Sequence, residues 1–209
     1  MHVPDGFLSP LVTLPAYAAA TPLWALGVRR HFGSAQVEAL PVLGSLTAVA
    51  FVIQTLMIPI PGGTSTHLLG VPLLALRYGP LAAFVAESLV LVLQALLLGA
   101  GGVTVLAVNA LAMGLIGPSA GWLLHRVLRP VHAGAAAFLG AAVALPVAAA
   151  VVAGVLGLQQ RLDPSYFPGP LPVVAAALLL PAVLAGLLEG AYTLVAMRLL
   201  GRVRGGAGA

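Results

Sequence analysis

The sequence predicts an all-α membrane protein with seven transmembrane helices, and three features support this fold class: the composition, the apolar runs and the positions of the arginines. Of the 209 residues, 61% are hydrophobic and only 7% are charged, whereas soluble domains contain about 45–50% apolar and about 25% charged residues. A soluble protein of this composition would have too few polar side chains to cover its surface. We therefore expect the chain to lie in a lipid bilayer.

Seven apolar runs follow one another along the chain. They cover residues 7–28, 37–60, 68–78, 81–98, 103–124, 133–158 and 171–199. An α-helix needs about 20 apolar residues to cross a bilayer, but the third run has only nine between His67 and Arg77, about 14 Å of helix. Two topologies are possible: six spans if 68–98 is one kinked helix, or seven if Tyr78-Gly79-Pro80 is a turn.

The arginines favour seven spans, because cytoplasmic loops carry an excess of basic residues. With seven spans and the N-terminus outside, eight of the nine arginines lie inside and only Arg161 lies outside. Six spans would leave three inside and five outside, with Arg77 in the membrane. The C-terminus is then cytoplasmic, residues 1–204 form one membrane domain, and 205–209 are expected to be a disordered tail. Arginines at the ends of apolar runs indicate topology, so no nucleic-acid partner is expected.

A third helix too short to cross the bilayer must begin below its surface. The preceding segment, residues 59–66, is then expected to dip into the membrane from outside as irregular backbone. Such backbone is tolerated at that depth only where protein buries it or where it lines a cavity. The sequence therefore predicts an outward-facing cavity floored by this loop, with His67 at the top of the short helix.

Two residue types are absent, and each absence excludes a kind of chemistry. There is no cysteine, which excludes disulfides and thiolate metal sites. There is no lysine, since all nine basic residues are arginine, and a phosphate-binding loop of the Walker type needs its lysine. ATP hydrolysis by that route is therefore excluded. An intramembrane protease is also not favoured, because the spans offer no nucleophile–base pair and no His-Glu-x-x-His motif.

The N-terminus carries three nitrogens in a spacing that suits a metal chelate. The Met1 amine, the His2 amide nitrogen and the His2 imidazole can close a five- and a six-membered ring on one ion. Cu(II) and Ni(II) displace the amide proton readily, and one further imidazole, that of His67, would complete their tetragonal geometry. The alternatives are a chance residue in a flexible tail for His2 and a hydrogen bond to a loop carbonyl for His67. The other three histidines are expected to be interfacial polar residues.

Several motifs carry a resemblance to a known family. They are Met-His-Val-Pro-Asp-Gly-Phe-Leu-Ser-Pro at positions 1–10, Pro-Gly-Gly-Thr-Ser-Thr-His-Leu-Leu-Gly at 61–70, Gln-Ala-Leu-Leu-Leu-Gly-Ala-Gly-Gly-Val-Thr at 94–104, and Glu189-Gly190 with Thr193. Together they resemble the nickel/cobalt substrate-binding (S) components of energy-coupling-factor (ECF) transporters, the CbiM/NikM family. The resemblance extends from residue 1 to about residue 193.

The resemblance implies a seven-helix fold with the N-terminus tucked into the protein centre. It implies that the Met1 amine, the His2 amide and imidazole, and His67 bind Ni²⁺ or Co²⁺ as the transported substrate, without an organic cofactor. Pro4-Asp5-Gly6 looks closer to nickel-type members. Two positions depart from many relatives, which have a polar residue at position 100 and a histidine at 182, where this chain has alanine.

The resemblance also implies partners and a location. The partners are a transmembrane T component, two ATPase subunits and a small accessory membrane protein, and the location is the prokaryotic inner membrane. The chain itself is then a transport subunit and not an enzyme. Two alternatives stay open: a stand-alone transition-metal permease, and a cobalt-specific subunit that serves cobalamin synthesis.

Four further residues are candidates for supporting the metal ligands: Asp5, Ser65, Gln94 and Asn109. Gln94 and Asn109 lie at the outer ends of their helices, on the expected cavity side, where second-shell contacts or simple interhelical hydrogen bonds are both possible. Asp5 either accepts a proton from a ligating imidazole or caps the first helix. The intramembrane Glu87 and Glu189 are expected to pair with interhelical donors.

Overall fold

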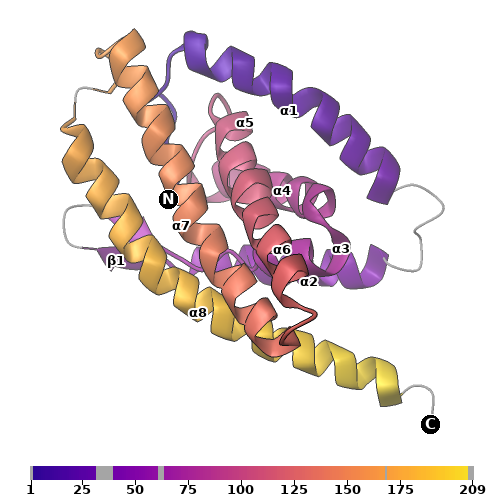
Figure 1. Cartoon of the computed structure of the whole chain (residues 1–209). Helices are drawn as coiled ribbons and strands as arrows, with labels where there is room; N and C mark the ends of the chain where they lie inside the picture. The colour runs from indigo at the N-terminus through magenta and orange to yellow at the C-terminus, as the bar shows by residue number, and fades with distance from the viewer. Residues whose placement is uncertain (1, 32–39, 61–63, 168, 207–209) are drawn as a thin grey trace.

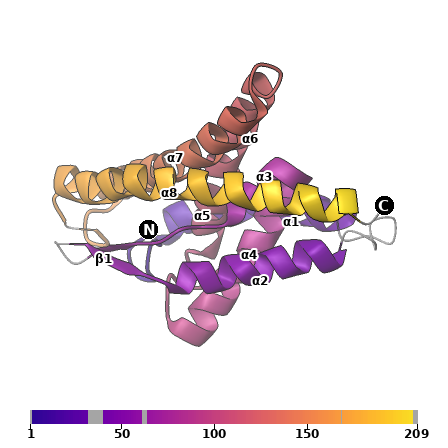
Figure 2. The same cartoon turned by 90° about the horizontal axis from the view of Figure 1, so that it is seen from below.

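The computed structural model describes the whole chain except residues 1, 32–39, 61–63, 168 and 207–209. It is a bundle of helices with one short hairpin (Figures 1 and 2). The elements in chain order are α1 (Pro10–His31), α2 (Leu40–Thr55), β1 (Ile58–Ile60), β2 (Thr64–Thr66), α3 (Val71–Tyr78), α4 (Pro80–Leu98), α5 (Leu106–Asn109), the π-helix η2 (Ala110–Ile116), α6 (Gly117–Leu128), α7 (Ala133–Leu162) and α8 (Leu171–Gly206).

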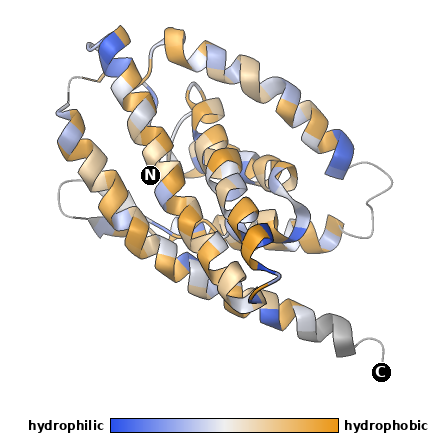
Figure 3. Cartoon of the chain, in the orientation of Figure 1, coloured by the Kyte–Doolittle hydropathy of each residue, from blue (hydrophilic) through white to orange (hydrophobic). Residues whose placement is uncertain are grey.

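The prediction of a helical membrane protein is confirmed. Among the described residues, five helical stretches are long and apolar enough to cross a membrane: Pro10–His31, Pro80–Leu98, Leu106–Leu128, Ala133–Leu162 and Leu171–Gly201. Apolar colours run along their outer faces, and hydrophilic colours gather at helix ends such as that of α1 (Figure 3). Many large apolar side chains point away from the protein, among them Leu180 at 70% exposure and Leu184 at 67%, as expected where lipid is the solvent.

Two helices are too short to cross alone. α2 has 16 residues and α3 has eight, about 24 Å and about 12 Å of helix, against a hydrocarbon core of about 30 Å. The third apolar run of the sequence is therefore a short helix, as its length indicated. On its N-terminal side, residues 56–60 and 64–70 are not helical.

The break between α3 and α4 is sharp, and Gly79 makes it. This residue has φ 92°, a backbone conformation that glycine adopts far more readily than other residues. Its N–H closes the last turn of α3 on the carbonyl of Ala75 at 2.9 Å, and Pro80 starts α4. A turn at Tyr78-Gly79-Pro80 is therefore confirmed, and one continuous kinked helix over 68–98 is excluded.

The segment before His67 differs from the expectation of irregular backbone. Residues 58–60 and 64–66 form a two-stranded antiparallel hairpin in which Ile58 pairs with Thr66, and this hairpin lies beside α8 (Figure 1). The expectation of a helical run as far as residue 60 was wrong by five residues, since α2 ends at Thr55. Strand pairing satisfies the backbone groups that the two strands turn toward each other, and membrane depth requires such internal pairing.

Close helix contacts hold α6, α7 and α8 together. A Cβ atom added at Gly121 would lie 2.1 Å from the carbonyl oxygen of Gly140, and one at Gly186 would lie 2.3 Å from that of Ala142. Only glycine permits such approach, and small residues are the common means of packing helices in membranes.

The C-terminal end of α8 reaches further than expected. The helix continues through Gly206, two residues into the segment that the sequence predicts to be a disordered tail, and residues 207–209 lie outside the described residues.

Candidate metal site

His67 lies in the protein interior, between the hairpin and α3. Its side chain is 1% exposed. Its Nδ1 lies 3.0 Å from the carbonyl oxygen of Leu68, so Nδ1 carries the proton and donates, which leaves a lone pair on Nε2. That Nε2 is buried without a hydrogen-bond partner. A buried, unpartnered ring nitrogen whose tautomer is fixed from the other side is the arrangement of a metal-binding imidazole.

His2 approaches His67 from the N-terminal segment. The two imidazoles are stacked with ring centroids 5.0 Å apart and an interplanar angle of 17°, and Nε2 of His2 is also buried without a partner. An imidazole nitrogen lies about 2 Å from a bound transition-metal ion, so two rings at this separation are close enough to share one. The structure thus brings together two histidines that are 65 residues apart in the sequence.

Both imidazoles are neutral at physiological pH. Burial lowers the pKa of His2 well below its ordinary value, and the neighbouring His67 lowers it further. Burial likewise lowers the pKa of His67 to about 4. Only a neutral imidazole has a lone pair for a metal, so desolvation keeps both rings in the binding-competent form.

Asn109 holds the N-terminal segment in place. Its Oδ1 accepts from the backbone N–H of Val3 at 3.0 Å, and its Nδ2 donates to the carbonyl of Val3, also at 3.0 Å. Both residues are buried. Asn109 directly precedes the π-helix η2, and π-helical turns occur frequently at functional sites. The two hydrogen bonds fix the residue next to His2.

Asp5 provides a second attachment, at the loop between α4 and α5. Its Oδ1 accepts from the backbone N–H of Thr104 at 3.0 Å and from the hydroxyl of the same residue. A Cβ atom added at Gly102 would lie 2.0 Å from Cγ of Asp5, so a side chain there would displace the Asp5 carboxylate. Asp5 therefore ties the terminal segment to the loop, and neither alternative considered for it, a proton acceptor for imidazole or a helix cap, is what the structure shows.

Further along the segment, Ser9 is held by α7. The side-chain oxygen of Gln159 accepts from the backbone N–H of Ser9 at 2.8 Å and from its hydroxyl at 2.9 Å. Gln159 is fully buried and its Nε2 donates to the carbonyl of Asp163 at 2.9 Å. Three residues that follow His2, Val3, Asp5 and Ser9, are therefore hydrogen-bonded to other parts of the protein. These bonds hold the N-terminal segment, and with it His2, in place.

The chain that follows His67 is held in a comparable way. The carboxylate of Glu189 on α8 accepts from the backbone N–H groups of Leu69 and Gly70, at 2.8 and 2.9 Å. Gln54 on α2 donates to the carbonyl of Leu69 at 2.9 Å. Gly70 has φ 70° and lies against Ala50, where an added Cβ would come within 3.1 Å. These contacts fix two of the three residues between His67 and the start of α3.

A chain of buried side chains connects the two halves of the site. Gln54 also donates to the carboxylate of Glu87 at 2.8 Å, and its own oxygen accepts from Gln94 at 3.2 Å. A side-chain hydrogen bond with Gln94 raises the pKa of the His2 imidazole, but the larger effect of burial lowers it. The side-chain oxygen of Gln94 is buried and has no partner, so it is free to accept from an imidazole N–H.

The predicted site residues thus fall into three groups. His2 and His67 meet in the interior, and Asp5, Gln94 and Asn109 surround them. The side chain of Ser65 and the whole of Met1 lie outside what the structure describes. Within the described residues no three His, Cys, Asp or Glu side chains gather in a metal-binding cluster, so a site here would need backbone nitrogens as ligands.

Sequence reasoning missed the roles of Gln54, Gln159 and Glu189. It expected Glu189 to pair with a donor on another helix. The partner is instead the backbone beside His67. The sequence did contain a signal for this pairing. A carboxylate inside a membrane needs hydrogen-bond donors, and the non-helical backbone near His67 offers N–H groups that no helix uses.

A cavity of about 240 Å³ opens next to His67. Its walls come from the hairpin and from α8, and apart from Thr66 and His67 its lining is apolar. The lining residues are Ile58, Pro59, Thr66, His67, Leu68, Pro181, Leu184, Ala185 and Leu188. A cavity beside the hairpin agrees with the sequence expectation that this loop borders one.

The fold and the site define a class: a multi-pass helical membrane protein with a pair of buried, neutral histidines in its interior. The family profile described as "Cobalt uptake substrate-specific transmembrane region", CbiM, matches residues 2–206. The chain belongs to this family, whose members are membrane components of metal transporters.

Named relatives support the same assignment. The chain is 36% identical to the "Probable fused nickel transport protein LarMN" of Lactiplantibacillus plantarum, over 97% of this chain and 65% of that protein. It is 34% identical to the cobalt transport protein CbiM of Geobacter sulfurreducens, over 98% of this chain and 60% of that protein. The chain therefore spans less than two thirds of the length of both relatives.

A solved structure has the same fold. The crystal structure of a truncated transition metal transporter superposes with a TM-score of 0.89 at 33% sequence identity, covering 97% of this chain and 99% of that chain. The arrangement of helices around the histidine pair is thus shared with a protein described as a transition-metal transporter.

Proposed function

We propose that this chain is the substrate-binding (S) subunit of an ECF-type transporter, and that it binds Ni²⁺ from outside the cell, with Co²⁺ as a weaker substrate. The observation that carries the proposal is the buried pair His2 and His67, with ring centroids 5.0 Å apart and the Nε2 of His67 buried without a partner. The nickel and cobalt transport functions named for the relatives support the choice of metal.

Four nitrogens would hold the ion: the Met1 amine, the His2 amide nitrogen, the His2 imidazole through Nδ1, and His67 through Nε2. The proton on His67 Nδ1, held by the Leu68 carbonyl, supports the assignment of Nε2. When His2 binds through Nδ1, its Nε2–H would donate to the unpartnered oxygen of Gln94. Loss of the amide proton favours ions such as Ni²⁺, for which a square of four nitrogens is a common geometry.

The proposed topology has seven spans over residues 1–204, with the N-terminus outside and the C-terminus in the cytoplasm of a prokaryotic cell. It is supported by the positive-inside rule, since only Arg161 then lies outside. We propose that α2 and α3 complete their crossings with the hairpin and residues 67–70, of which His67, Leu69 and Gly70 are buried by the surrounding helices. The metal site then lies near the outer side, where an incoming ion arrives.

Transport needs an energy source that this chain lacks. We propose a T component, two ATPase subunits and a small accessory membrane protein as partners. The word "fused" in the LarMN name, and the 65% of that protein that the chain spans, agree with such an accessory partner. Nickel uptake by cells that contain this chain should require the ATPase partners, whereas uptake by this chain alone would indicate a stand-alone permease.

The decisive binding experiment uses the free N-terminus. Protein whose first residue is verified as Met1 by mass spectrometry is titrated with Ni²⁺ in a calorimeter. Adding Gly-Ser before Met1 moves the amine away and converts the Met1 nitrogen to an amide, so tight binding should be lost. A C-terminal extension of the same length is the control and should leave the affinity unchanged. Equal affinity of both extended proteins would refute the chelate.

A further inference from the structure

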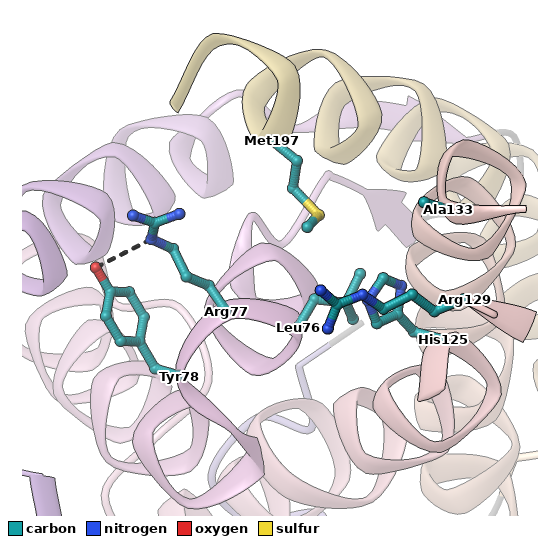
Figure 4. A pocket seen from close by; sticks show the side chains of 7 residues that line it. All are labelled: Leu76, Arg77, Tyr78, His125, Arg129, Ala133 and Met197. Atoms are coloured by element: carbon teal, nitrogen blue, oxygen red, sulfur yellow. Dashed lines mark hydrogen bonds between the residues drawn. The ribbon is translucent and has the colours of Figure 1, made fainter. Parts of the chain in front are cut away.

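A basic pocket of about 400 Å³ lies at the far end of the protein from the histidine pair. It is lined by residues from α3, α6, the α6–α7 loop, α7 and α8, which are Leu76, Arg77, Tyr78, His125, Arg129, Ala133 and Met197 (Figure 4). Twenty residues of mostly helical chain separate Arg129 from Asn109 at the metal site, about 30 Å of helix. The metal site makes no use of any residue of this pocket.

The pocket holds positive charge without a matching carboxylate. Arg77 lies on one side and Arg129 on the other (Figure 4), and no ion pair of either residue is present among the described residues. The four acidic side chains that the structure describes are engaged elsewhere: Asp5 with Thr104, Asp163 with Ser165, Glu87 with Gln54, and Glu189 with the backbone beside His67. The fifth acidic residue, Glu38, lies outside the described residues.

A second polar group lacks a partner there. His125 is 6% exposed, lines the pocket, and has a buried Nδ1 with no hydrogen bond. Arg77 is positioned by the hydroxyl of Tyr78, to which its Nε donates at 3.3 Å. Two guanidinium groups, an unpaired ring nitrogen and a tyrosine around one cavity suit an anion with several oxygens, and arginine binds phosphate oxygens through charge-assisted, often bidentate hydrogen bonds.

The rest of the lining points to a lipid. Leu76, Ala133 and Met197 give the pocket an apolar part, and under the proposed topology the pocket lies at the cytoplasmic surface. A neighbouring pocket of about 400 Å³ shares Tyr78 and adds Arg30, His31 and Trp122. Basic pockets between helices on this side of a membrane bind the head groups of anionic lipids.

We propose that the pocket around Arg77 and Arg129 binds the phosphate of an anionic phospholipid of the inner leaflet. The two guanidinium groups would bind the phosphate oxygens from opposite sides, His125 would donate a third contact when protonated at Nδ1, and the apolar part would face the start of the acyl chains. Since α3 carries this site at its C-terminal end and follows His67 at its N-terminal end, the lipid would anchor the short helix that the metal site depends on.

The test is native mass spectrometry of the detergent-purified chain with phosphatidylglycerol and with phosphatidylcholine of the same acyl chains. We expect one bound phosphatidylglycerol with at least a tenfold preference over phosphatidylcholine. The double variant Arg77→Gln with Arg129→Gln should lose this preference. Arg161→Gln removes an arginine from the opposite end and should keep it. A helical circular-dichroism spectrum and a monodisperse gel-filtration peak equal to those of the unmodified protein show that the fold of each variant is intact.

A second measurement needs no variant. Photoactivatable phosphatidylglycerol is cross-linked to the unmodified chain, and the labelled peptides should centre on residues 76–78 and 125–129. Three results would overturn the proposal: cross-links spread evenly over the lipid-facing helices, a preference for phosphatidylglycerol that survives the double variant, or inorganic phosphate displacing the lipid at millimolar concentration. A double variant that keeps its lipid but no longer co-purifies with its transport partners would instead assign the pocket to protein docking.

Discussion

Removal of the Asn109 side chain tests how strongly the N-terminal segment is anchored. Asn109→Ala deletes both hydrogen bonds to Val3, each 3.0 Å long and buried. A net hydrogen bond contributes about 1 kcal/mol, and a buried group left unsatisfied costs about 1–3 kcal/mol. The loss is then about 2–6 kcal/mol for the ordered terminal segment. Since about 1.4 kcal/mol is tenfold in affinity, nickel binding should weaken by at least about 30-fold.

Calorimetric titration with Ni²⁺ measures this effect, and two variants serve as controls. Asn109→Asp keeps the acceptor for the Val3 N–H but loses the donor to the Val3 carbonyl. Its nickel affinity should therefore lie between that of the unmodified protein and that of Asn109→Ala. Gln160→Ala breaks another amide–backbone hydrogen bond, the 2.7 Å contact with the carbonyl of Gly169, away from the site, and should bind nickel normally. An affinity of Asn109→Ala within threefold of the unmodified protein would refute the anchoring role.

Two further predictions concern the other half of the site. His67→Ala should reduce nickel affinity by orders of magnitude, whereas His132→Ala, which removes only the acceptor for the Ala135 N–H at the start of α7, should bind normally; equal binding would make His67 structural. Glu189→Gln can accept only one of the two N–H groups beside His67 and should bind about 10- to 100-fold more weakly, while Thr193→Val, one turn along the same helix, should not change binding; calorimetric titration measures both, and an unchanged affinity of Glu189→Gln would contradict its role.

The sequence was informative wherever a single residue decided local structure. Gly79 marked the turn between two helices, and the residue count between His67 and Arg77 limited the length of α3. His2 was singled out because three nitrogens of one terminus can chelate an ion by covalent geometry alone. These inferences needed no tertiary contact.

The remaining features depend on tertiary contacts that one sequence does not encode locally. Strands of three residues are too short for a periodic pattern, so the hairpin before His67 was not predicted and α2 was extended past Thr55. Glu189 and Leu69 are 120 residues apart, and nothing near either one indicates their pairing. Gln159 was likewise unremarkable at the end of a long apolar helix until the structure placed Ser9 beside it.

The electronic state of bound nickel tests the central claim, a square of four nitrogens from Met1, His2 and His67, most directly. Such a set, with a deprotonated amide, should give a low-spin Ni(II) complex that is diamagnetic and yellow, with a d–d band in the visible. Absorption and magnetic susceptibility of the purified nickel-loaded protein measure this. A paramagnetic, pale-green, octahedral complex would show that oxygen or water ligands dominate, and it would contradict the proposed chelate even in a protein that transports nickel.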